Sequence, residues 1–139
     1  LFVNGKKLRK HAGYALSKIG VNDIRPEVIT AAYDMQQRKL IEIAKCLNKN
    51  PEIFIVDETT TALSETGRNL LYKKMEELKN EGRSVLFISH DLDELMEKCD
   101  TLTVLRDGNI VEQGSHTELM EKGGFYSELY NAQFAGTTI

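Results

Sequence analysis

The feature that most constrains the fold is an alternation of apolar strand patterns and helical patterns between residues 53 and 99. Residues 53–57 and 84–89 have the length and composition of buried strands, and a helical pattern with Leu71, Met75 and Leu78 separates them. A second helical pattern follows, with apolar residues at Leu92, Leu95, Met96 and Cys99. Because this order is typical of right-handed crossovers, we expect an α/β fold with a parallel sheet.

Two helices are predicted before this alternation. An amphipathic helix ends at Gly20, and its apolar positions are Leu8, Ala12, Leu16 and Ile19. A stronger helix is expected from near Asp34 to Leu47, where residues 48–51 stop it.

A hairpin and two short helices are predicted after the alternation. Asp107 and Gly108 lie between the short apolar runs 101–105 and 110–113, a pattern that favours a tight hairpin. We expect this antiparallel pair to end the parallel sheet. Gly123 and Gly124 then separate two short helical patterns that would pack on the core.

The composition indicates an ordinary globular chain of 139 residues with a net charge of -3. No apolar run approaches the roughly 20 residues that span a bilayer, and no signal peptide is recognisable, so we expect a chain neither embedded in a membrane nor secreted. The basic cluster at residues 6–11 lacks aromatic residues and favours a solvated helix face over a nucleic-acid patch. Cys46 and Cys99 lack metal-site spacing and are expected to be buried free thiols.

Polar residues follow both predicted strands. Asp57 and Glu58 end the first, and His90 follows the second. Parallel sheets bind ligands outside the carboxyl ends of their strands, so these side chains would share one rim. Asp57 would bind Mg²⁺, Glu58 would polarise an attacking water, and His90 would donate a hydrogen bond to a terminal phosphate. Each motif alone also fits a simple loop start or a capping residue.

Three segments resemble the nucleotide-binding domain of ABC transporters. They are Ile-Phe-Ile-Val-Asp-Glu-Thr-Thr-Thr-Ala-Leu-Ser at 53–64, Val-Leu-Phe-Ile-Ser-His-Asp-Leu-Asp-Glu at 85–94 and Leu-Arg-Asp-Gly-Asn-Ile-Val at 105–111. The resemblance covers about residues 33–112. It implies that Asp57 is the Walker B aspartate, Glu58 the catalytic glutamate and His90 the switch histidine.

The same resemblance implies a D-loop that contacts an opposing subunit, formed by Thr61, Ala62, Leu63 and Ser64. Thr59 stands where many members have proline, which would loosen the turn without removing a catalytic group.

The signature motif of the family, Leu-Ser-Gly-Gly-Gln, corresponds to Tyr-Asp-Met-Gln-Gln at 33–37, where only Gln37 is retained. In the family this helix start binds the phosphate held by the other subunit. A carboxylate at Asp34, about 4 Å from a phosphate charge, would repel it by about 4 kcal/mol at an effective dielectric of 20, and by about 1 kcal/mol in water. Asp34 is also a good N-cap, and the two interpretations are compatible.

The chain has no Gly-x-x-x-x-Gly-Lys-Ser/Thr loop to hold phosphates, since Gly5-Lys6 is followed by Lys7. Residues 1–5 resemble the stretch after the glutamine loop in sugar-importer ATPases. We therefore expect the C-terminal part of an ABC nucleotide-binding domain. Residues 1–50 would belong to its helical subdomain, with a degenerate signature, and residues 51–139 to its RecA-like P-loop NTPase core.

The resemblance implies a parent protein that hydrolyses ATP with Mg²⁺ to energise membrane transport. Its partners would be a second nucleotide-binding domain and a transmembrane permease, at the cytoplasmic face of the membrane. The isolated chain is expected to be inactive, and the alternative is a non-catalytic module that docks on another ATPase domain or a permease. Residues 41–45 and 62–65 resemble sugar importers whereas residues 111–119 and 124–130 resemble exporters, so direction and substrate stay open.

Overall fold

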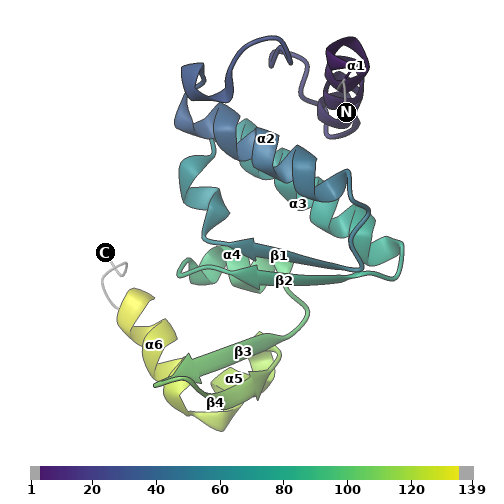
Figure 1. Ribbon diagram of the computed structural model, residues 1–139. Helices are drawn as coiled ribbons and strands as arrows, with labels where there is room; N and C mark the ends of the chain where they lie inside the picture. The colour runs from purple at the N-terminus through teal and green to yellow at the C-terminus, as the bar shows by residue number, and fades with distance from the viewer. Residues whose placement is uncertain (1–3, 135–139) are drawn as a thin grey trace. The chain divides into compact units, whose positions relative to one another are not determined.

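The computed structural model describes residues 4–134 and confirms the expected α/β class (Figure 1). The chain divides into two compact units, of which the first ends at Ile88 and the second begins at Ser89. These units are defined by packing alone. The predicted division between a helical subdomain and a RecA-like core at residues 50 and 51 stays a prediction.

The first unit opens with helix α1 (Gly5–Lys18), which Asn4 caps by accepting a hydrogen bond from the Lys7 amide at 3.1 Å. Gly20, in the left-handed region at φ 81°, follows the end of the helix as expected. The buried apolar side chains are Ala15, Leu16 and Ile19. The predicted apolar stripe was wrong in its first half, since Leu8 and Ala12 are exposed. The turn of helix that carries them has no covering element in the described residues.

Helix α2 (Met35–Leu47) follows a short 3₁₀ turn, η1 (Thr30–Ala32), and buries Leu40, Ile43 and Ala44. Its start at Asp34 and its end at Leu47 agree with the sequence prediction. Cys46 on this helix is exposed, so the expectation that it is a buried thiol was wrong. Its position falls outside the buried stripe of the helix.

The predicted crossover is confirmed. Strand β1 (Ile53–Asp57) pairs in parallel with strand β2 (Ser84–Ile88), from Ile53 opposite Ser84 to Asp57 opposite Ile88. Between them run the 3₁₀ turn η2 (Thr59–Ala62) and helix α3 (Glu65–Asn80), whose buried side chains include Leu71, Met75 and Leu78. Figure 1 shows α2 and α3 on the same side of this strand pair.

Only one face of the β1–β2 pair is buried. Phe54, Val56 and Phe87 are at most 9% exposed, and the Tyr72 ring of α3 meets Phe87 edge to face at 6.4 Å. The opposite face carries four aliphatic side chains that are 43–64% exposed: Ile53, Ile55, Leu86 and Ile88. The expectation that both strands are buried was therefore half wrong, because α3 covers one face and no described element of the first unit covers the other.

The second unit contains helix α4 (Leu92–Lys98), the hairpin strands β3 (Leu102–Arg106) and β4 (Asn109–Gly114), and helices α5 (His116–Lys122) and α6 (Phe125–Phe134). Asp107 and Gly108 form the predicted turn with φ of 50° and 76°, the left-handed pair that a two-residue hairpin needs. The hairpin is a separate two-stranded sheet, which corrects the expectation that it would end the parallel sheet. Hydrogen bonds across the turn pair β3 and β4 locally, whereas the Asp-Gly pattern carries no information about a third strand.

A small core and one buried carboxylate hold the second unit together. Leu102, Leu119 and Tyr126 are at most 6% exposed and pack together. Glu112 on β4 is 7% exposed, and its Oε2 accepts the Tyr126 amide at 2.7 Å. Gly124 permits this contact, because a Cβ there would lie 1.8 Å from Glu112 Oε1. The carboxylate thus ties β4 to the start of α6.

Candidate functional site

The carboxyl end of β1 presents two carboxylates, as predicted. Asp57 is the last residue of the strand and is exposed, opposite Ile88 in the register. The amide of Glu58 donates to the Ile88 carbonyl at 2.9 Å, so the pairing with β2 continues one residue beyond the strand. Glu58 itself has φ 43° and ψ 26°. Such left-handed backbone at a residue other than glycine costs about 1–3 kcal/mol and is concentrated at functional sites.

Threonine hydroxyls hold this turn. Thr59 Oγ1 donates to the Asp57 carbonyl at 3.2 Å, and Thr61 Oγ1 donates to the Glu58 carbonyl at 2.9 Å. Thr60 between them is 3% exposed. Side chains that bond to nearby backbone in this way are typical of tight turns. Thr59 was expected to loosen the turn. Its hydroxyl opposes this by donating to the Asp57 carbonyl, a hydrogen bond that proline could not form.

The predicted D-loop residues lead directly into α3. Ala62 closes the 3₁₀ turn, Leu63 is buried at 5% exposure, and Ser64 caps α3 by accepting the Gly67 amide at 3.3 Å. The Ser64 amide donates in turn to Oε1 of Gln36 at 2.9 Å. The structure therefore brings the start of α2 and the D-loop segment together through one side chain.

The sequence interpretation missed the hydrogen bond that Gln36 accepts. Its position corresponds to a glycine of the family signature, so a side chain there was noted only as a departure. The replacement of glycine by glutamine could have indicated such a contact, because the glutamine side chain has a donor and an acceptor that glycine lacks. The partner lies 28 residues away in sequence, and only the fold identifies it.

Asp34 caps α2. Its Oδ1 accepts the Gln37 amide at 2.8 Å, while Oε1 of Gln37 accepts the Asp34 amide at 3.4 Å, which completes a capping box. The segment before it is also tied down, because the Tyr33 hydroxyl accepts from the Arg25 amide at 2.7 Å and donates to the Arg25 carbonyl at 3.0 Å. Asp34 and the retained Gln37 of the predicted signature thus each accept the other's backbone amide.

His90 is exposed and lies in a tightly bonded segment at the start of the second unit. The amide of Asp91 donates to Ser89 Oγ at 3.0 Å, and Asp91 caps α4 by accepting the amides of Asp93 and Glu94. Asp57 and Glu58 belong to the first unit, so the grouping of His90 with them stays a prediction from the order of the strands.

Known proteins match most of the chain, although no protein-family model does. A putative ribose/galactose/methyl galactoside import ATP-binding protein 1 from Agrobacterium fabrum is 40% identical over 109 residues, 78% of this chain and 21% of the relative. The xylose import ATP-binding protein XylG of Brucella abortus is 35% identical over 118 residues, 85% of this chain and 23% of the relative. A bacterial Atm1-family ABC exporter solved with ATP bound superposes with a TM-score of 0.73 at 26% identity, over 90% of this chain and 23% of the exporter.

The chain belongs to the ATP-binding domains of ABC transporters. A solved ATP-binding subunit of an ABC transporter shares the fold, with a TM-score of 0.73 at 20% identity over 88% of this chain and 60% of that subunit. The chain spans about a fifth of the length of the curated relatives it matches. These matches agree with the interpretation of the chain as a C-terminal portion of such a domain.

The donor set of this ABC domain fits a metal shared with a phosphate. Within residues 4–134, no group of three or more His, Cys, Asp and Glu side chains is gathered to hold a metal. Mg²⁺ is ordinarily bound by one or two carboxylates together with phosphates and water. Asp57 offers one such carboxylate, exposed at a rigid strand end. The residues therefore suit a magnesium nucleotide complex and do not suit a cage made of protein ligands alone.

Proposed function

We propose that the protein to which this chain belongs is an ATPase subunit that energises monosaccharide import. The two relatives named above, at 35% and 40% identity, are import ATP-binding proteins, one for xylose and one, putatively, for ribose, galactose and methyl galactoside. The observation that carries the catalytic part of the proposal is the left-handed Glu58 at the end of β1. A strained backbone that follows a strand-end aspartate is costly to retain without a use.

Each site residue then has a separate task. Bound ATP and Mg²⁺ supply the terminal phosphate that is transferred to water and the charge that stabilises it. Asp57 would hold the metal, and Glu58 would orient the attacking water and accept its proton. His90 would donate a hydrogen bond to the terminal phosphate as negative charge develops there. The turn at Glu58 separates the metal ligand from the base, because it redirects the chain immediately after Asp57.

The test of Glu58 uses the longer protein, which would supply the phosphate-binding half. Glu58→Gln should abolish steady-state ATP hydrolysis while ATP binding is retained, because the amide preserves shape but cannot accept the proton. Glu76→Gln, an exposed glutamate on α3, is the matched control and should keep full turnover. Turnover by the Glu58 variant close to that of the control would refute the assignment.

The 139-residue chain by itself should show no measurable ATPase activity. Its sequence has no phosphate-binding loop, so the main anchor for a nucleotide is missing. Isothermal titration calorimetry with magnesium ATP should detect weak binding at most. Tight binding by this chain would mean that the residues at the carboxyl end of β1 suffice for nucleotide recognition.

A second function, a non-catalytic docking module, is favoured by the observation at Asp34. Its carboxylate occupies the start of α2, where the family signature would bind the phosphate of an opposing subunit. Asp34→Ser restores the family's serine and keeps an N-cap, so the helix should stay folded. If Asp34 weakens the shared site, this variant of the longer protein should hydrolyse ATP faster. If neither Asp34→Ser nor Glu58→Gln changes the rate of ATP hydrolysis, the docking module is favoured.

The partners would be a second nucleotide-binding domain, which the D-loop at Thr61, Ala62, Leu63 and Ser64 would contact, and a transmembrane permease. No helix within residues 4–134 is long and apolar enough to cross a membrane. In this proposal the permease holds the protein at the inner face of the membrane. Affinity purification of the longer protein from detergent-solubilised membranes should recover a permease, and recovery with nucleic acid instead would contradict a role in transport.

A further inference from the structure

Gln36 joins the start of α2 to the end of the turn that follows β1. It is the second residue of α2 and is half-buried, and its Oε1 accepts the Ser64 amide at 2.9 Å. The two residues are 28 positions apart in sequence, and Ser64 is also the residue that caps α3. One side chain of α2 therefore fixes the place where the turn ends and α3 begins.

The helix end of this turn is held at two neighbouring residues. The backbone of Ser64 is extended, with φ -65° and ψ 167°, and its amide donates to Gln36 while its hydroxyl accepts the Gly67 amide at 3.3 Å. Leu63 before it is 5% exposed, and the Leu63 amide donates to the Thr60 carbonyl at 3.1 Å. The turn is thus anchored by the buried Leu63 and, through Ser64, by a different helix.

The strand end of the same turn is held by its own side chains. The hydroxyls of Thr59 and Thr61 donate to the carbonyls of Asp57 and Glu58, bonds that span two or three residues. Glu58 has a left-handed backbone, and a strained residue of this kind persists only where the surrounding structure holds it. The hydroxyls keep the local shape of the turn, whereas Gln36 ties its far end to α2.

A role in stability alone fits the Gln36 bond poorly. The apolar side chains that α2 and α3 bury already hold these helices in the first unit. Ser64 is exposed, so water can replace a lost partner of its amide, and a hydrogen bond at such a place adds little to the stability of the fold. What the bond does fix is the position of Ser64.

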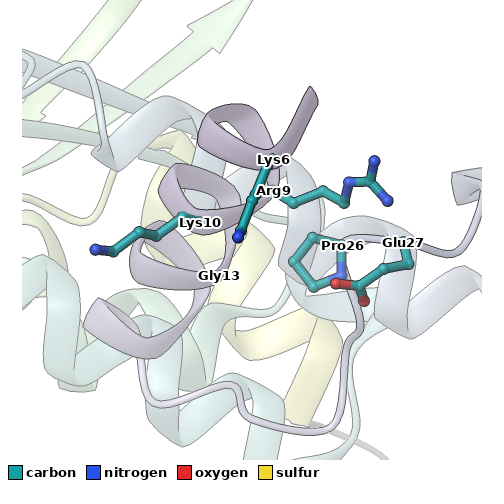
Figure 2. A pocket seen from close by; sticks show the side chains of 6 residues that line it. All are labelled: Lys6, Arg9, Lys10, Gly13, Pro26 and Glu27. Carbon is teal, nitrogen blue, oxygen red and sulfur yellow. The ribbon is translucent and has the colours of Figure 1, made fainter. Parts of the chain in front are cut away.

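A direct contact between Gln36 and a ligand is not indicated either. An open hollow of about 590 Å³ lies between α1 and the loop that follows it, and Figure 2 shows the residues that line it: Lys6, Arg9, Lys10, Gly13, Pro26 and Glu27. Gln36 and Ser64 are not among them. Since Oε1 of Gln36 is bonded to Ser64, Gln36 would act through that residue.

We propose that Gln36 is a positioning residue, which holds residues 61–64, the D-loop segment, in the place where that segment meets an opposing subunit. This inference rests on the proposed function, because the contact with a second nucleotide-binding domain is taken from there. Gln36 corresponds to a glycine of the family signature, and glycine has no side-chain acceptor for the Ser64 amide. The anchor therefore depends on the altered signature of this chain.

Amide hydrogen exchange in the 139-residue chain, followed by NMR, tests the contact itself. Gln36→Leu keeps the bulk of the side chain but removes the acceptor, so the Ser64 amide should exchange about two- to tenfold faster. Gln36→Glu keeps an acceptor oxygen and should return the rate to within about twofold of the original. Gln133→Leu makes the same change as Gln36→Leu at an exposed position on α6 and should leave the Ser64 amide unchanged. The Leu71 amide in α3 should exchange at the original rate in every variant, because the fold keeps its stability.

Steady-state ATP hydrolysis by the longer protein tests the consequence. Gln36→Leu should lower kcat by about tenfold or more, because a misplacement of about 1 Å is enough to lose that much rate. KM should stay within about twofold of the original, and so should ATP binding measured in the Glu58→Gln background. Gln133→Leu is again the control and should keep both kcat and KM. Gln36→Glu is confined to the exchange experiment, since its added charge beside Asp34 would also repel a phosphate.

Different results would overturn different steps. Unchanged exchange of the Ser64 amide in Gln36→Leu, or no recovery in Gln36→Glu, would refute the contact. Faster exchange with a kcat equal to that of the control would refute the positioning role, and if Glu58→Gln still abolished turnover, the proposed function would stand. A parallel loss of kcat, ATP binding and Leu71 protection would assign Gln36 to stability alone. Retained turnover by Glu58→Gln would refute the proposed function and this inference with it, whatever the exchange rate at Ser64.

Discussion

The two strand pairs of this molecule are completed in different ways. The antiparallel pair β3–β4 buries one face under α5 and α6, and its outer face mixes Leu105 and Ile110 with a Gln113–Thr103 hydrogen bond of 3.2 Å. The parallel pair β1–β2 also has one covered face, but its outer face carries four exposed aliphatic side chains: Ile53, Ile55, Leu86 and Ile88. Antiparallel sheets commonly expose one face, whereas parallel sheets are ordinarily covered on both.

The difference shows what each pair needs from the rest of the chain. A two-residue turn aligns β3 with β4, and nearby residues supply the cover, so this pair is complete within the second unit. The β1–β2 pair depends on a crossover helix for one face, and no described element of the first unit covers the other. The curated relatives are about five times longer than the matched portion, and we expect another part of such a protein to cover the aliphatic face.

The largest effect should come from α3, the helix that covers one face of the parallel pair. Leu71 on α3 is 0% exposed, so Leu71→Ala should destabilise the chain by about 2–5 kcal/mol through lost burial and a cavity. Leu86→Ala on the exposed face should change stability by less than about 0.5 kcal/mol. Urea unfolding followed by circular dichroism measures both. Similar losses for the two variants would contradict the difference between the faces.

The second effect concerns the polar contact that completes the hairpin unit. Gly124→Ala would place a Cβ against the Glu112 carboxylate, which must then move away from the Tyr126 amide. We expect a loss of about 1–3 kcal/mol in the free energy of unfolding. Gly13→Ala, where the new Cβ meets only ordinary contacts, should be neutral or slightly stabilising.

A double-mutant cycle sharpens this prediction. If the clash with Glu112 is the cause, Gly124→Ala should cost less in the Glu112→Ala background than in the original chain. Strictly additive losses would show that Gly124 matters for another reason.

Neighbouring residues of β1 provide a smaller, matched comparison. Val56 is 2% exposed and Ile55 is 59% exposed, and threonine retains the branching that strands favour. Val56→Thr should cost about 1–2 kcal/mol because a hydroxyl becomes buried, while Ile55→Thr should cost less than about 0.5 kcal/mol. In the longer protein the cost of Ile55→Thr should approach that of Val56→Thr. An unchanged small cost there would mean that the aliphatic face stays exposed.

The smallest effect should be the acid sensitivity of α5 in the hairpin unit. Hydrogen bonds from the Ser115 amide and hydroxyl hold the pKa of Glu118 below its usual value. Since the folded pKa lies below the unfolded one, this contribution is complete above the unfolded pKa and is lost as the pH falls through the folded pKa. Ser115→Ala should therefore flatten the acid limb of the stability curve between about pH 6 and about pH 3. A limb as steep as the original would exclude the Ser115 hydroxyl as its source.

Local patterns predicted the elements well. The cap at Asp34, the Asp107–Gly108 turn and the stripe of α3 each depend on neighbours a few residues away, and the structure has two helices and a hairpin at these places. The half of the α1 stripe at Leu8 and the outer face of β1 were predicted wrongly. Apolar spacing indicates that a face can be buried, but it does not identify an element that buries it.

The sequence by itself determined the order of the elements, the residues at the strand ends and the family resemblance, because these depend on spacing along the chain. Only the tertiary structure decided which face of β1 is covered, that Gln36 bonds to Ser64, and that Glu58 adopts a left-handed backbone. Those outcomes depend on segments that are distant in sequence and on how a strained turn is held by its neighbours. The cover of a strand face is a property of the packed chain, and no local pattern encodes it.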